Sequence, residues 1–165
     1  MGECSRDGGA RTVFPGDSQL KRSAALVALL LASCHADETP PKIAVEDAWA
    51  RATVPGQSGS AAYFTIANEG GADRLLTVSS PVADASLHST SMNNGVMRMR
   101  PLEALDVPAE STVALKPGGT HVMLMALKQP LADGGTLELE LKFEKSGEQR
   151  VMAEVRPSTA NGEGM

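Results

Sequence analysis

The sequence predicts an all-β domain, either a sandwich or a barrel, over residues 43–156. Short apolar stretches are separated by turn signals about every ten residues, a spacing typical of this fold class. No stretch shows the longer period of an amphipathic helix. Hydrophobic residues make up 42% of the 165-residue chain but aromatic residues only 3%. We therefore expect a single core built from leucine, valine, isoleucine, alanine and methionine.

The first five strands follow from turn signals between apolar stretches. They are expected at 43–51, 61–68, 74–79, 86–92 and 96–100. Asn68-Glu-Gly-Gly71 separates the second strand from the third, because asparagine and glycine favour turns. Asn93-Asn94-Gly95 separates the fourth from the fifth and predicts a tight hairpin, since these residues accept the positive φ angles of a two-residue turn.

The last four strands are expected at 111–115, 121–127, 136–143 and 149–155. Pro117-Gly-Gly119, Asp133-Gly-Gly135 and Ser146-Gly147 mark the turns around them. The stretch 137–143 alternates strictly between apolar and charged residues, so its apolar side chains point inward and its charged side chains outward. This strand is therefore predicted to belong to a sheet with one face in water.

Residues 1–33 are interpreted as an N-terminal extension followed by a signal peptide. Lys21-Arg22 precede an apolar run of about a dozen residues, which has the length of a signal core and is too short to cross a bilayer as an ordinary helix. Leu31-Ala-Ser-Cys34 resembles the lipobox of bacterial lipoproteins, which implies cleavage before Cys34 and a lipid on Cys34. The alternative is an ordinary secretory signal with an incidental Cys34, and both interpretations predict export.

Residues 34–42 are expected to be a polar tether to the lipid, and residues 157–165 are expected to be a disordered tail.

Charge and cysteine usage exclude several classes of protein. The two cysteines, Cys4 and Cys34, both precede the predicted domain, so it has no disulfide and no thiolate ligand. Fifteen basic residues against twenty acidic ones give a net charge of −5, which argues against nucleic acid as a partner.

Methionine and histidine are concentrated in one stretch of the predicted domain. Its members are His88, Met92, Met97, Met99, His121, Met123 and Met125. Methionine alone more often fills a core. On a strand, however, His121 and Met123 share one face, while Val122 and Leu124 point to the opposite, buried face. Core packing does not explain a histidine on a face shared with methionines.

The predicted hairpin brings a second pair of donors together. If Asn93-Asn94 form the loop, His88 lies opposite Met99. If Asn94-Gly95 form it, Met99 lies opposite Thr90 and diagonal to His88. Both registers place His88 and Met99 on one face within reach of each other, whereas a three-residue loop would separate them.

Two imidazoles and two thioethers suit Cu(I). Thioether sulfur is uncharged and soft, which favours Cu(I) over Mg²⁺, Ca²⁺ or structural Zn²⁺. In an oxidising compartment, methionine and histidine bind cuprous ion without forming disulfides. The lack of cysteine in the domain excludes a blue-copper electron-transfer centre. No catalytic constellation is found, so the protein is not expected to be an enzyme.

The four donors resemble the H-x10-M-x21-H-x-M pattern of the PCuAC family of extracytoplasmic copper chaperones. His88, Met99, His121 and Met123 match this pattern without a gap. The flanking sequence is also similar to that family, from about residue 43 to residue 155. The similar segments are Asp47-Ala-Trp49-Ala-Arg51, Ala61-Ala-Tyr63, Gly95-Val-Met-Arg-Met99-Arg100, Leu115-Lys-Pro-Gly-Gly119 and the segment from His121 to Pro130.

The resemblance implies a cupredoxin-like Greek-key β-barrel or sandwich that holds Cu(I) in an exposed site at these four residues. It also implies delivery of copper toward the CuA centre of cytochrome c oxidase, with that oxidase subunit and a Sco-type thiol protein as partners. Met97 and Met125 share faces with the ligands and are interpreted as secondary ligands, a soft rim or simple hydrophobic lining. Two alternatives stay open: a copper sequestration or uptake protein without an oxidase client, and a metal-free β-sandwich interaction module.

Overall fold

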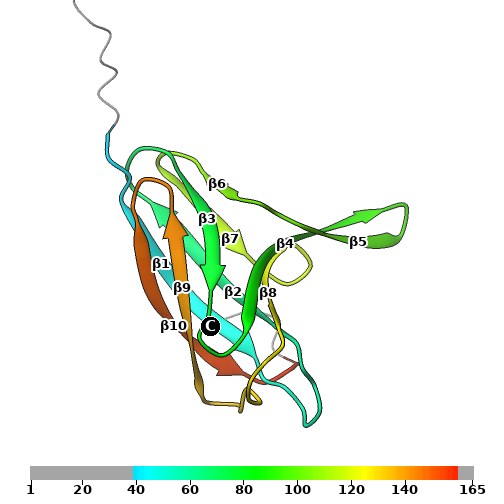
Figure 1. The fold of residues 1–165 in the computed structure, drawn as a ribbon. Helices are drawn as coiled ribbons and strands as arrows, with labels where there is room; N and C mark the ends of the chain where they lie inside the picture. The colour runs from blue at the N-terminus through cyan, green and yellow to red at the C-terminus, as the bar shows by residue number, and fades with distance from the viewer. Residues whose placement is uncertain (1–38, 160–165) are drawn as a thin grey trace, which may run out of the picture. The chain divides into compact units, whose positions relative to one another are not determined.

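The computed structural model describes residues 39–159, which lie in one compact unit. This part of the chain contains ten strands and no α-helix (Figure 1). The strands are β1 (Ile43–Arg51), β2 (Ser60–Asn68), β3 (Asp73–Ser79), β4 (Asp84–Asn93), β5 (Val96–Pro101), β6 (Leu105–Val107), β7 (Ser111–Leu115), β8 (Thr120–Met125), β9 (Thr136–Phe143) and β10 (Glu148–Arg156). The all-β prediction is confirmed. The signal peptide, Cys34 and most of the predicted tether and tail lie outside the described residues.

The strands form one mixed sheet in the order β5-β4-β8-β2-β1-β10-β9-β3-β6. β1 and β10 run parallel, whereas β2 is antiparallel to both β1 and β8. The second half of β2 pairs with β7, which lies off the main path. β3 and β4 are distant in this order but contact each other, so the sheet curls around one core. In Figure 1 the β4–β5 hairpin projects from this body.

The core is built from aliphatic side chains and two phenylalanines. The apolar residues of β9 are buried and alternate with more exposed charged residues, which confirms the predicted sidedness of this strand. The largest fully buried side chains are Phe64, Phe143, Ile66, Leu75, Leu124, Leu137, Leu139, Leu141, Val107, Val122 and Val155. The expected contribution of methionine to the core is wrong for residues 39–159, because none of the methionines there is buried.

Two strand predictions differ from the structure. β6 was not expected, because three residues are too few to show an alternation, and this strand forms only by pairing with β3. β8 ends at Met125 rather than at residue 127, since Ala126 has a φ of 49° that breaks the extended backbone. The other predicted strands agree with the observed ones to within about two residues.

The chain enters the domain along the turn between β2 and β3. The Pro40 carbonyl accepts a hydrogen bond from the N–H of Gly71, and the Lys42 carbonyl accepts one from the N–H of Glu69. A Cβ atom at Gly70 or Gly71 would collide with the backbone of residues 39–42, so both positions require glycine. Within residues 39–159 there is no apolar helix of membrane-spanning length.

Candidate metal centre

β8 separates core side chains from the predicted ligands. Val122 and Leu124 are fully buried in the core, so His121 and Met123 project from the opposite face of the strand. The His121 side chain is not open to solvent on that face, since the residue is only 5% exposed. Met123 is half-buried.

β4 brings His88 next to His121. The two residues are paired directly across the β4–β8 ladder, so their side chains lie on the same face of the sheet. Their ring centroids are 6.2 Å apart. The sequence did not predict this cross-strand pair, because three strands lie between β4 and β8 in the chain and no local pattern sets their register.

The β4–β5 hairpin adopts the second of the two predicted registers. Asn94 and Gly95 form its turn with φ angles of 50° and 77°, and Thr90 pairs with Met99. Met97 and Met99 consequently lie on the face that carries His88. Every residue of β5 is exposed, so packing does not explain why this strand carries methionines.

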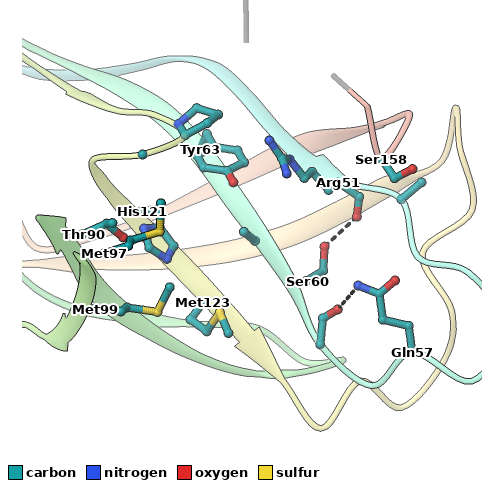
Figure 2. A pocket seen from close by; sticks show the side chains of 15 residues that line it. Arg51, Gln57, Ser60, Tyr63, Thr90, Met97, Met99, His121, Met123 and Ser158 are labelled. Atoms are coloured by element: carbon teal, nitrogen blue, oxygen red, sulfur yellow. Dashed lines mark hydrogen bonds between the residues drawn. The ribbon is translucent and has the colours of Figure 1, made fainter. Parts of the chain in front are cut away.

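One cleft of about 440 Å³ collects most of the predicted donors (Figure 2). Its sulfur-lined part is formed by Met97, Met99, His121 and Met123. Its polar part includes Arg51, Gln57, Ser60, Tyr63 and Ser158. In Figure 2 the side chains of Met97, Met99 and Met123 lie beside and below His121, and Tyr63 lies on the side of His121 toward Arg51. His88 adjoins this cleft through its ring contact with His121 but does not line it, and neither does Met125.

Hydrogen bonds orient the His121 ring. Its Nδ1 lies 3.0 Å from the Gly119 carbonyl oxygen. A carbonyl can only accept, so Nδ1 carries a proton, and in the neutral ring Nε2 keeps a lone pair. In His88, the Nε2 atom lies 3.1 Å from the Ser86 hydroxyl. The Nδ1 atom of His88 is buried and has no hydrogen-bond partner among residues 39–159. Each histidine therefore has a ring nitrogen that a metal ion could satisfy.

A row of rings continues from the two histidines across the sheet. The Tyr63 ring centroid on β2 lies 6.3 Å from that of His121 and 4.5 Å from that of Trp49 on β1. The Arg51 guanidinium carbon lies 5.7 Å from the Tyr63 ring centroid. Burial raises the pKa of Tyr63, and the positive charge of Arg51 opposes only part of this rise. The Tyr63 phenol is therefore neutral at physiological pH.

Arg51 and Tyr63 are among the cleft residues that were not predicted as site residues. Tyr63 is buried, so packing alone would account for a tyrosine at this position. Carboxylates do not take the place of the soft donors, because no cluster of three or more His, Cys, Asp or Glu suitable for a metal occurs in the described part of the chain. A metal in this cleft would depend on imidazole together with methionine sulfur.

Comparisons with known proteins identify the family of this domain. Residues 43–155 match the family described as "Putative lipoprotein LpqE-like". A relative from Leifsonia xyli subsp. xyli (strain CTCB07), "Putative lipoprotein Lxx21020", is 32% identical over 126 residues, which cover 72% of this chain and 75% of the relative.

Solved structures with a similar fold include two that contain copper. The copper-bound PCuAC domain from PmoF2 is 30% identical, with a TM-score of 0.60, 70% of this chain covered and 93% of that domain. The solution structure of CuI-DR1885 from Deinococcus radiodurans is 29% identical, with a TM-score of 0.56, 82% of this chain covered and 89% of that one. The predicted cupredoxin-like all-β fold is confirmed by these matches. The chain belongs to the LpqE-like lipoprotein family, and its described domain has the structure of a PCuAC domain.

Proposed function

We propose that this protein is an extracytoplasmic copper carrier that binds Cu(I) at the sulfur-lined part of the cleft. The observation that carries the proposal is the gathering of soft and imidazole donors from β4, β5 and β8 on one face of the sheet. The names of two similar structures, one copper-bound and one CuI-bound, give independent support. The proposed role is binding and transfer, and no catalytic reaction is assigned.

The proposed ligands are His88, Met99, His121 and Met123. Imidazole nitrogens bind metals at about 2 Å, so two rings whose centroids are 6.2 Å apart can share one ion. Thioether sulfur adds soft donors that favour the cuprous state. All four donors are neutral, so the complex keeps the single positive charge of Cu(I).

We assign the rim position to Met97 rather than Met125, because Met97 lines the cleft. Met97 and Met99 are 61% and 48% exposed. Ligands of a partner protein can therefore replace those of the carrier one at a time, without release of free ion. Copper affinity is expected to fall at acid pH, where protonated imidazole no longer binds metal.

A titration of the protein with Cu(I) against a chromophoric chelator tests the site. One equivalent is expected to bind tightly. In a Met99→Leu, Met123→Leu double variant the affinity should fall by at least about tenfold, because leucine keeps the apolar volume but removes the sulfur. Met152→Leu is the matched control, since Met152 is exposed on β10 and lies outside the cleft. Tight binding that persists in the double variant would contradict the proposed ligands.

The proposed recipient is the CuA subunit of cytochrome c oxidase, reached alongside a Sco-type thiol protein. This assignment comes from the resemblance to PCuAC chaperones. A deletion strain grown under copper limitation is expected to lose oxidase activity and to regain it when copper is added. Normal oxidase activity under limitation would instead favour sequestration or uptake without an oxidase client.

The proposed location is the extracytoplasmic face of a membrane, or the periplasm, with attachment through a lipid on Cys34. The lipoprotein names of the family and of the Leifsonia relative support this assignment. A carrier held at a membrane would work close to membrane-bound recipients.

A further inference from the structure

The cleft is larger than a single metal ion requires. Its volume of about 440 Å³ lies in the range of small-molecule sites. Three of the predicted copper ligands, Met99, His121 and Met123, line only its sulfur-lined part. Among the described residues that line it, Arg51 is the only one of the charged types Lys, Arg, Asp and Glu. The polar part of the cleft is therefore positively charged and has no carboxylate of its own.

Arg51 has no carboxylate partner among residues 39–159. Its Nε is buried and lacks a hydrogen-bond partner there, and its described interaction is with the Tyr63 ring. Two other arginines on the sheet do have carboxylate partners: Arg74 pairs with Asp106, and Arg156 pairs with Glu154. The guanidinium therefore brings to the cleft a positive charge that no described carboxylate offsets, and a ligand in the cleft would reach it through its two Nη atoms, so this position suits an anionic ligand.

Polar groups that line the cleft with Arg51 include two that already donate hydrogen bonds and two hydroxyls that are free to donate. The amide of Gln57 and the hydroxyl of Ser60 already donate to backbone carbonyls at 2.7 and 2.6 Å. The hydroxyls of Tyr63 and Ser158 line the same part of the cleft and have no hydrogen bond among the described residues. These two free hydroxyls can donate hydrogen bonds to the oxygens of an anion that the guanidinium binds.

We infer that the cleft binds a small organic carboxylate, whose oxygens contact Arg51 while the rest of the molecule extends toward the sulfur-lined part. The planar guanidinium matches a carboxylate in geometry, with two parallel hydrogen bonds. The Tyr63 and His121 rings, 6.3 Å apart between centroids, span the distance between the two parts. This site uses residues that the proposed copper ligands leave free, so it goes beyond the proposed function.

If copper binds as proposed, the carboxylate and the metal should strengthen each other's binding. Cu(I) on neutral donors leaves one positive charge in the same cleft as the guanidinium. A carboxylate between them offsets their repulsion. By thermodynamic linkage, copper must raise the affinity for carboxylate by the same factor as carboxylate raises the affinity for copper.

Titration of copper-free, ¹⁵N-labelled protein with propionate, followed by NMR, tests the carboxylate site. Propionamide is the matched probe, since it has nearly the same shape without the charge. Propionate alone is expected to shift the Arg51 Nε–H signal and the amide signal of Gly59. Arg51→Gln should weaken propionate binding by about tenfold or more, because a charge-assisted hydrogen bond is lost. Arg156→Gln should bind normally, since Arg156 stacks on Trp49 outside the cleft.

The inference is overturned if propionate leaves the Arg51 signal unchanged, or if Arg51→Gln binds propionate as the unmodified protein does. Should Arg51→Gln fail to fold, Arg51→Lys keeps the charge but not the two-pronged geometry. It is expected to bind propionate several-fold more weakly, and equal affinity would also overturn the inference. Since the titration contains no copper, its failure leaves the copper proposal standing, and a failed copper titration leaves this site standing.

Discussion

Asp73 is a buried carboxylate that holds the β9–β10 turn against β3. Its oxygens accept hydrogen bonds from the backbone N–H groups of Arg74, Lys145 and Ser146 and from the Ser146 hydroxyl. Burial alone would raise the pKa of Asp73, but these hydrogen bonds outweigh it and hold the pKa below its ordinary value. The resulting stability is present above the unfolded-state pKa and is lost as the pH falls through the lower folded-state pKa.

Asp73→Asn is expected to reduce the free energy of unfolding by about 2 kcal/mol at neutral pH, because an amide has one accepting oxygen for four donors. Denaturant unfolding at a series of pH values measures this difference, which should shrink below about pH 4. Asp106→Asn is the control, since Asp106 is an exposed partner of Arg74 and should contribute less than about 1 kcal/mol. An Asp73→Asn variant as stable as the unmodified protein at pH 7 would refute this role.

At the scale of single residues, the sequence predicted which face of a strand a side chain occupies better than it predicted which residues of other strands lie beside it. The two-residue spacing of His121 and Met123 was enough to separate them from Val122 and Leu124. Arg51 could not be found in this way, because it reaches the cleft only through the pairing of β1 with β2. Such a long-range register leaves no local pattern in the sequence.

Among the elements, the β4–β5 hairpin depends most on its turn. β5 has no buried residue, so little besides the turn and the pairing with β4 maintains the register that places Met99 near His88. Gly95→Ala puts a Cβ on a residue with a φ of 77°, at a cost of about 1 kcal/mol. The hairpin should then loosen in the free protein, and copper binding has to restore it. We expect about fivefold weaker Cu(I) binding in the chelator competition, with little change in the thermal midpoint.

Gly147→Ala is the matched control for this hairpin. Gly147 has a φ of 78° and, like Gly95, has open space where the alanine Cβ would lie, with no contact within 4 Å. It lies in the turn between β9 and β10, whose apolar residues belong to the core. Gly147→Ala should therefore lower the thermal midpoint and leave copper affinity unchanged. Equal effects of the two substitutions on copper affinity would show that the β4–β5 turn has no special role.

Strand existence was largely predictable from apolar stretches and turn residues, while strand partners were not. The hairpin register with Asn94-Gly95 as its loop was one of two that the sequence allowed, and both kept His88 and Met99 on one face. The parallel pairing of β1 with β10 joins the two ends of the domain. This pairing depends on the packing of the whole core. The formation of β6 depends on it too, because three residues are too few for a strand to be recognised from the sequence.

In the molecule as a whole, the cleft and the entry of the chain lie at opposite ends of β1. Pro40 contacts Gly71 just before β1 begins, and Arg51 at the end of β1 lines the cleft. Nine fully extended residues would span about 30 Å, and the bulge at Asp47 makes β1 somewhat shorter. The described chain therefore enters the domain at the end of β1 that is remote from the cleft, and the proposed lipid anchor on Cys34 is expected to leave the cleft accessible to partners.

Cys34→Ala is accordingly expected to move the protein from the membrane fraction to the soluble fraction without a change in copper affinity. Fractionation followed by immunoblotting measures the first effect, and the chelator competition measures the second. Cys4→Ala is the matched control, since Cys4 precedes the predicted cleavage site and should leave the distribution unchanged. If Cys34→Ala stays in the membrane fraction, the lipid is not the anchor. If it becomes soluble but loses copper, the separation of anchor and cleft along β1 is wrong.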